Sequence, residues 1–178
     1  MRRPALICLL FLIALPSACR KNAQRPEGPR PSDRVIERTL DFYYESEDLL
    51  LHAERRGLRV PENEAAALGP VLREFLKGPR NPAQARPFPP DVVLRGVYLL
   101  PDGNAIVDLG GATLTAGWNT GTHSEILAVY SLVQTLAANF SNVRQVRILV
   151  NGQAAETLAG HIRLDRPLRP APDLLAKR

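Results

Sequence analysis

The chain has 178 residues, two cysteines and a formal net charge of +5. This length holds one domain of ordinary size with short flanking segments, and it leaves no room for a second domain. The Lys and Arg residues of the folded part do not gather along one helix or strand, as they do in proteins that neutralise nucleic-acid phosphates. We therefore expect no nucleic-acid partner.

The first eighteen residues predict an export signal. Arg2 and Arg3 form a positively charged start, residues 5–15 form an uncharged apolar run, and small residues follow. The apolar run is too short to cross a bilayer as a stable helix. We expect residues 1–18 to be removed as a signal peptide and the mature chain to work on the periplasmic side of a bacterial membrane.

Cys19 directly follows Ser-Ala, an arrangement that resembles the bacterial lipoprotein signal, in which this cysteine is acylated. The prediction is a lipid anchor at Cys19. Pro16 stands three positions earlier, where Leu is usual, and the alternative is cleavage near Ala18 that releases a soluble, secreted protein. Because Cys8 leaves with the signal, the mature chain can form no intrachain disulfide.

Two proline-containing segments flank the predicted domain. Residues 19–34 show no apolar periodicity and predict a Pro/Arg-rich tether. Residues 167–178 contain three further prolines and predict a disordered C-terminal tail. The folded domain is thus expected over residues 35–166.

The first half of this domain predicts two strands and a helix. Residues 39–44 alternate apolar and polar side chains, and residues 49–60 form a second extended run. Asn63 is a candidate N-cap for a helix over residues 64–77, which Pro70 should kink or restart.

A β-hairpin and a second helix follow. Residues 92–100 and 105–109 flank a Pro-Asp-Gly-Asn turn, and their alternation places Tyr98 and Leu100 toward the core. Thr122 and Glu125 have the spacing of a capping box at the start of the second helix. The apolar stripe of this helix is expected to anchor the core; it consists of Ile126, Val129, Tyr130, Val133, Leu136, Ala137 and Phe140.

Two more strands complete the domain. Residues 143–150 form one, Asn151-Gly152 is a strong type I′ turn signal, and residues 153–158 form the other. The order β-β-α-β-β-α-β-β predicts a single α+β domain with two helices packed on a mainly antiparallel sheet.

Several segments in this order resemble the sporulation and spore germination domain, GerMN, of bacterial envelope proteins. They are the aromatic strand at 40–44, the helix end at 75–79, the hairpin at 99–109, and the run from Ser124 through Gly152 to His161. The resemblance implies a noncatalytic extracytoplasmic module, often carried by lipoproteins, that serves in envelope assemblies or as an interaction platform. It implies no catalytic residues and no cofactor.

The alternative class is an envelope hydrolase acting on peptidoglycan or an ester. Ser124 and His123 are the obvious candidates, but neighbouring helical residues point about 100° apart, so they cannot easily pair as nucleophile and base. The three histidines lie in different elements with no cysteine beside them, so we expect no metal site.

One face of the second helix predicts a contact surface, because it carries no charge between Glu125 and Arg144. Its partner would be an envelope protein or a second copy of the chain. The alternative is a second packing layer, with the loop over residues 110–121 folded across it. The residues of this predicted interaction face are Leu127, Ser131, Leu132, Gln134, Thr135 and Asn139.

Overall fold

The computed structural model describes residues 34–118 and 120–177. The predicted export signal, Cys19 and the tether up to residue 33 lie outside the described residues. Within the described part, no helix has the length and apolar character needed to cross a membrane.

The described elements form two sheets and three α-helices. Strands β1 (Val35–Glu45) and β2 (Leu51–Pro61) pair as an antiparallel hairpin. Strands β3 (Val93–Leu99), β4 (Asn104–Gly110), β5 (Gln145–Val150) and β6 (Gln153–Ala154) form a second sheet in that order, with only β4 and β5 parallel. The helices are α1 (Glu64–Leu76), α2 (Ala112–Ala116) and α3 (Thr122–Asn139), and a 3-10 turn, η2, covers Pro172–Leu174. The α+β class is confirmed, although the strands divide between two sheets.

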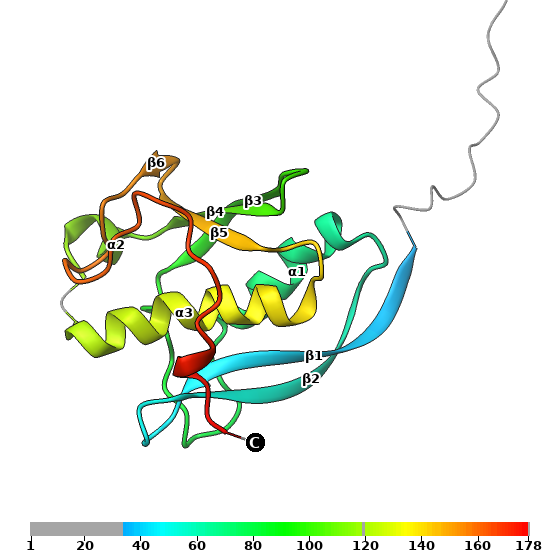
Figure 1. The fold of residues 1–178 in the computed structure, drawn as a ribbon, viewed down its shortest axis with the longest axis horizontal. Helices are drawn as coiled ribbons and strands as arrows, with labels where there is room; N and C mark the ends of the chain where they lie inside the picture. Colours follow the sequence, from blue (N-terminus) through cyan, green and yellow to red (C-terminus); the bar gives the residue numbers. More distant parts are fainter. Residues whose placement is uncertain (1–33, 119, 178) are drawn as a thin grey trace, which may run out of the picture.

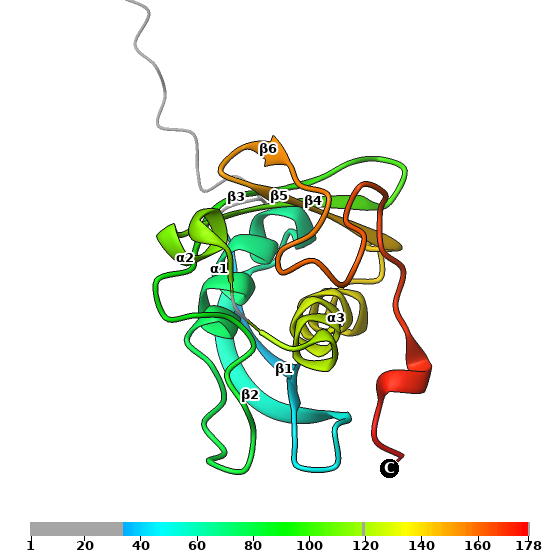
Figure 2. The ribbon, with the colours of Figure 1, turned by 90° about the vertical axis from the view of Figure 1, so that its left-hand side faces the viewer.

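The elements stack in three layers, with the hairpin β1–β2 below, helices α1 and α3 in the middle and the four-stranded sheet above (Figure 1). Helix α3 contacts β1 and β5, and α1 contacts β2 and β3. The side view shows α3 enclosed between the hairpin and the sheet (Figure 2). A helix that is apolar on most of its surface needs this position, because each of its sides must leave water.

Local sequence signals account for several element boundaries. The Asn63 side chain accepts a hydrogen bond from the Ala66 amide at 3.0 Å, so the predicted N-cap of α1 is confirmed. Helix α1 continues through Pro70. Asn151 and Gly152 both have positive φ angles, as a type I′ turn requires.

Strand β3 differs from its predicted orientation. Its register with β4 shifts between Leu94 and Gly96, so Arg95 is an extra residue in the ladder. A bulge of this kind reverses the alternation beyond it. Tyr98 is therefore 65% exposed and Leu100 38% exposed, instead of facing the core.

The predicted capping box at the start of α3 is not formed. Gly121 is the N-cap and makes no side-chain cap hydrogen bond. The Glu125 carboxylate instead accepts four hydrogen bonds from residues 157–161, at 2.7–2.9 Å. Because this segment wraps around Glu125, the last strand ends at Ala154 and not at the predicted residue 158.

The predicted interaction face of α3 lies against the hairpin. Leu127, Ser131, Leu132 and Thr135 are buried, and Gln134 and Asn139 are half-buried. These side chains are therefore not a free contact surface. Leu127 packs with residues of the hairpin and of the C-terminal segment, and Thr135 and Asn139 bond to β1; the loop over residues 110–121 is not what they contact.

Two polar members of this face, Thr135 and Asn139, bond to the edge of β1 that does not pair with β2. The Tyr43 amide donates to Thr135 Oγ1 at 3.0 Å. The Asn139 side chain accepts from the Asp41 amide at 3.0 Å and donates to the Asp41 carbonyl at 2.7 Å. Backbone groups on a strand edge need such partners when they are buried. The neutral character of the helix face thus has a structural cause.

We predict that Thr135→Val lowers the free energy of unfolding by about 1–2 kcal/mol, because it leaves the buried Tyr43 amide without an acceptor. Urea denaturation followed by circular dichroism measures the change. Thr39→Val is the matched control, because Thr39 is exposed on the same strand as Tyr43. Equal stability of the two variants would contradict this role of Thr135.

The predicted disorder of the C-terminal segment is wrong for its described residues. Leu168 and Val146 exchange two backbone hydrogen bonds, of 2.7 and 2.8 Å. The chain then runs from the upper sheet down to the hairpin (Figure 2), where the Ala176 amide donates to the Leu51 carbonyl at 3.1 Å. Leu174 and Leu175 pack against a small apolar cluster of Tyr43, Leu51 and Leu127. Apolar burial and backbone pairing together hold this segment in place.

Candidate interaction groove

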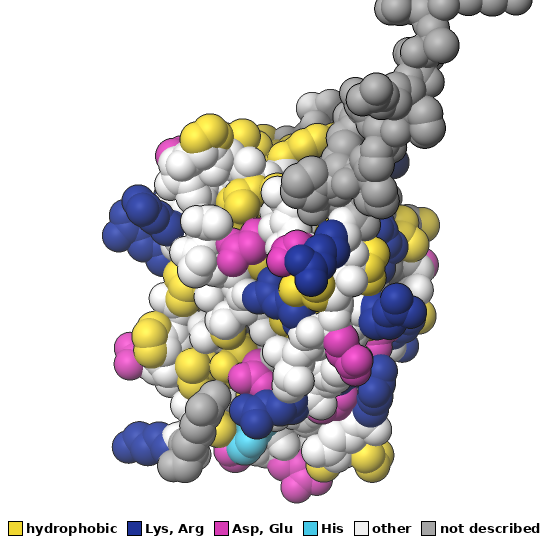
Figure 3. All heavy atoms as spheres, turned by 90° about the vertical axis from the view of Figure 1, so that its right-hand side faces the viewer, with side chains coloured by type: hydrophobic (Ala, Val, Ile, Leu, Met, Phe, Trp, Pro, Cys, Tyr) yellow, Lys and Arg dark blue, Asp and Glu magenta, His cyan; other side chains and the backbone are white. Residues whose placement is uncertain are grey.

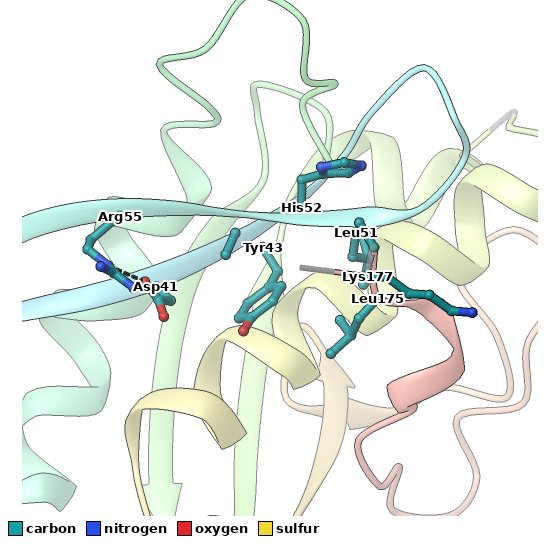
Figure 4. Close-up of a pocket in the computed structure, with 9 residues that line it drawn as sticks. Asp41, Tyr43, Leu51, His52, Arg55, Leu175 and Lys177 are labelled. Atoms are coloured by element: carbon teal, nitrogen blue, oxygen red, sulfur yellow. Dashed lines mark hydrogen bonds and ion pairs between the residues drawn. The ribbon is translucent and has the colours of Figure 1, made fainter.

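A groove of about 420 Å³ lies between the hairpin and the last described residues of the chain. We call it the C-terminal groove. Figure 4 shows Tyr43, Leu51 and Leu175 on one side of the hairpin ribbon and His52 turned to the other side. The groove is lined by Asp41, Tyr43, Leu51, His52, Ala53, Arg55, Leu175, Ala176 and Lys177.

The alternation of the hairpin strands produces this arrangement. Asp41 lies opposite Arg55, and Tyr43 lies opposite Ala53, so these four side chains share one face. Tyr43 and Leu51 are 7% and 1% exposed, which gives the groove a largely apolar floor. The C-terminal residues close one side.

The outer edge of β2 borders the groove and is an open hydrogen-bonding edge. The Tyr43 amide points away from β2, toward Thr135, so Tyr43 and Ala53 are a non-hydrogen-bonded pair. The backbone groups of Ala53, Arg55, Gly57 and Arg59 must then point outward. No described residue outside the hairpin bonds to these groups. Ala176 already bonds to this edge at Leu51 and begins a third, parallel strand.

The charges around the groove are mixed. Arg55 Nε lies 3.1 Å from Asp41 Oδ1, and the Arg55 side chain is 67% exposed. His52 pairs with Asp48 at 2.8 Å, and the hydrogen bond from His52 is the main reason that the pKa of Asp48 lies below its usual range. On the end of the molecule drawn in Figure 3, Lys and Arg side chains are scattered among Asp, Glu and apolar ones.

A second polar cluster is buried between β2 and α1. Arg56 is 3% exposed and donates to Glu54 at 2.6 Å, to Glu74 at 3.2 Å and to the Gly78 carbonyl at 2.8 Å. Its guanidinium also lies over the Phe42 ring, 4.9 Å from the centroid. Burial favours the neutral form of Glu54 and Glu74, but hydrogen bonds and nearby positive charges outweigh it, so the pKa of each carboxyl is lowered. The guanidinium at the centre of this cluster is buried, so the cluster is a structural feature and not an open site.

Residues 41–156 match the family described as Germane, sporulation and spore germination. This match covers more than half of the chain. The chain belongs to the sporulation and spore germination family. No curated protein matches its sequence.

Two solved structures are similar to this family member. One is a Clostridium perfringens protein whose description as a lipoprotein is provisional; it has a TM-score of 0.55 and 19% identity, and the match covers 80% of this chain and 93% of that one. The other contains the tandem GerMN domains of the sporulation protein GerM from Bacillus subtilis, with a TM-score of 0.57 and 20% identity. That match covers 80% of this chain and 48% of the tandem protein, so this chain spans about half of its length. At 19% and 20% sequence identity, the similarity to these two structures shows a shared fold and nothing more.

The histidines of this GerMN chain are dispersed among the described residues. His123 Nε2 lies 3.1 Å from the Leu49 carbonyl oxygen, so the ring faces the hairpin turn and not Ser124. His161 Nδ1 lies 3.2 Å from Thr122 Oγ1, and His52 pairs with Asp48. Within the described part of the chain, no group of three or more His, Cys, Asp or Glu side chains is placed to hold a metal ion.

Sequence reasoning missed the C-terminal groove because the prolines near the end of the chain obscured the apolar residues among them. Leu168, Leu174 and Leu175 are the signal that could have located it, since a solvated tail has little reason to contain three large apolar residues. The open edge of β2 had no comparable signal, because pairing partners depend on the tertiary arrangement.

Proposed function

We propose that the chain is a noncatalytic, extracytoplasmic interaction module of the bacterial cell envelope, anchored to a membrane through Cys19. Membership of the sporulation and spore germination family and the predicted export signal support this function. The observation that carries it is the open edge of β2 beside the C-terminal groove, which offers backbone donors and acceptors next to an apolar floor.

The partner in this proposal is an extended segment of another envelope protein. Such a segment adds to β2 as a strand, bonds to the outward groups of Ala53, Arg55 and Gly57, and places alternate side chains in the groove. Main-chain pairing supplies affinity in this mode, and the groove supplies specificity. The short stretch at Leu175–Ala176 occupies only the first position of the edge.

Two substitutions at Ala53 test the edge. Ala53→Pro removes the outward amide and keeps the pairing with β1, because proline is tolerated where the amide of an edge strand faces solvent. Ala53→Val keeps the amide and is the matched control. Affinity capture from bacterial membranes, with quantitative mass spectrometry, should recover a specific partner with the wild type and Ala53→Val but much less with Ala53→Pro.

Equal recovery by all three proteins would mean that the β2 edge is not the binding surface. Light scattering on the purified chain distinguishes an envelope partner from self-association. A dimer that Ala53→Pro dissociates would show that the partner is a second copy.

The lipid anchor has its own test. The mass of the mature protein, isolated from membranes, is expected to show cleavage before Cys19 and acyl chains on its first residue. Cys19→Ser should move the exported protein from the membrane fraction to the soluble one, because removal of the acyl chains removes about 0.8 kcal/mol of membrane affinity per buried CH₂ group. Unmodified Cys19 in the mature protein would contradict lipid anchoring.

A further inference from the structure

A second pocket, of about 360 Å³, lies next to the end of β1. Three segments line it: the end of β1, the proline-rich loop before β3, and the stretch that leads into the first turn of α3. We call it the Trp118 pocket. Its lining residues are Glu45, Ala85, Arg86, Pro87, Phe88, Pro89, Pro90, Trp118, Thr120 and Ser124. This volume is in the range of sites that bind small molecules.

The aromatic wall of the pocket is held in place by the core. Phe88 is 3% exposed, and its ring centroid lies 5.9 Å from that of Trp118. Trp118 is half-buried, so one part of the indole packs on Phe88 and another part remains accessible. The prolines of the 87–90 loop add rigid apolar surface beside it.

The polar groups of the pocket are available for a ligand. Among the described residues, neither the Glu45 carboxylate nor the Ser124 hydroxyl makes a hydrogen bond or an ion pair. Glu45 is half-buried, and this burial raises the pKa of its carboxyl, an effect that the nearby His123 partly opposes. A half-buried carboxylate without a hydrogen-bond donor is costly, and donors from a ligand would remove this cost.

Charge restricts the class of ligand. An anion would be repelled by Glu45. A cation would meet the positive charge of Arg86, whose guanidinium is fixed near the pocket by bonds to the carbonyls of Leu76 and Lys77, at 2.9 and 2.6 Å. A neutral ligand that has many hydroxyl groups and one apolar face suits both charges and the indole.

We propose that the Trp118 pocket binds the pyranose ring of a saccharide. The CH face of the ring packs on the indole of Trp118, its hydroxyl groups donate to Glu45, and the Ser124 hydroxyl completes the polar contacts. This site is separate from the β2 edge, so it extends the proposed function and does not depend on it.

Fluorescence provides a direct test, because Trp118 is the only tryptophan in the chain. The purified full chain is titrated with N,N′-diacetylchitobiose and, separately, with cellobiose, while tryptophan emission is recorded. We expect a saturable change with at least one of these neutral disaccharides. Lysine amide, a cationic probe, should give no saturable change.

Three variants locate the binding. Glu45→Ala should weaken the saccharide about tenfold, because it removes a charged hydrogen-bond acceptor. Ser124→Ala should weaken it less. Glu47→Ala is the matched control and should bind like the wild type, because Glu47 is exposed in the turn after β1. Circular dichroism verifies that each variant is folded.

Three outcomes would overturn the proposal: no saturable change with either disaccharide, a saccharide affinity that Glu45→Ala leaves intact, or preferential binding of lysine amide. None of these results concerns the β2 edge. Loss of the partner with Ala53→Pro and loss of the saccharide with Glu45→Ala are therefore separate findings.

Discussion

Replacing Glu125 with alanine should lower the free energy of unfolding by about 3–5 kcal/mol, because four donors lose one shared, buried acceptor. Glu125 Oε1 accepts from the Thr157 hydroxyl and from the amides of Leu158 and Ala159, and Oε2 accepts from the His161 amide. Glu125 itself is 0% exposed. Water cannot easily take its place in the variant, so residues 157–161 should lose their attachment to α3.

The pH dependence of the free energy of unfolding should also reflect the ionisation of Glu125. Burial alone would raise the pKa of Glu125, but the hydrogen bonds from Ala159, Thr157, His161 and Leu158 outweigh burial and lower it. A carboxyl whose pKa is lower in the folded state stabilises the protein at a pH above its unfolded value, here 4.5. This stabilisation decreases as the pH falls below that value through the folded-state pKa. The loss of stability on acidification should therefore be shallower in Glu125→Gln than in the wild type.

Urea denaturation at neutral pH and at several acidic values measures both effects. Glu156→Ala is the matched control, since Glu156 lies next to the same segment and is exposed. It should stay within about 0.5 kcal/mol of the wild type. A Glu125→Ala protein as stable as this control would show that the four hydrogen bonds contribute little.

The parts of the fold that the sequence predicts well are those set by local residues. Asn63 caps α1, and Asn151-Gly152 forms the tight turn, because each depends on the chemistry of one or two side chains. The amphipathic stripe of α3 is also visible in the sequence, and Val129, Val133, Leu136 and Phe140 are buried. The family resemblance rests on these segments and is confirmed by the match over residues 41–156.

The parts that the sequence does not predict depend on what packs against each element. Helix α3 is buried on two sides, and its polar side chains Thr135 and Asn139 bond to a strand more than ninety residues away. From the sequence, such a neutral polar face is indistinguishable from an interaction surface. Likewise, the bulge at Arg95 inserts one residue into the ladder and turns Tyr98 outward, although the alternation pattern gives no sign of it.

The two candidate sites were also not predictable from the sequence, because they too depend on how distant elements pack together. The C-terminal groove and the Trp118 pocket each combine segments that are distant in the sequence, such as Tyr43 with Leu175 and Glu45 with Trp118. Periodicity places these residues on strands or in loops. It does not bring them together, because that depends on the docking of the hairpin against α3 and on the path of the chain ends.

The second large effect is expected at Arg56. Arg56→Met should lower the free energy of unfolding by about 3–5 kcal/mol, because it leaves two carboxylates without their shared cation. The Arg56 side chain is 1% exposed, and those of Glu54 and Glu74 are 14% and 9% exposed. Methionine has a similar length and can pack on Phe42 and Tyr44, so the loss should come mainly from the unpaired charges.

The other hydrogen bonds and ion pairs of Glu54 and Glu74 determine how much stability is lost when Arg56 is replaced. Glu54 still accepts from the amides of Arg80 and Asn81, at 2.8 and 3.0 Å, and Glu74 still pairs with Lys77 at 2.8 Å and with Arg80 at 2.9 Å. The double substitution Arg56→Met with Glu54→Gln should therefore recover part of the stability, because it removes the carboxylate that is left without a cation. Arg56→Lys should be intermediate, since one ammonium group cannot reproduce the planar fork that reaches Glu54, Glu74 and the Gly78 carbonyl.

The neighbouring arginine is a matched control. Arg55→Met removes the same chemical group one position along β2, but the Arg55 side chain is 67% exposed and its ion pair with Asp41 faces solvent. Exposed pairs contribute about 0–1 kcal/mol, so this variant should remain close to the wild type. If Arg55→Met and Arg56→Met were equally stable, burial of the guanidinium would contribute nothing beyond a surface ion pair. Because Arg56 joins β2 to the end of α1, a large difference between them would show that this buried cluster contributes to the attachment of the hairpin to α1.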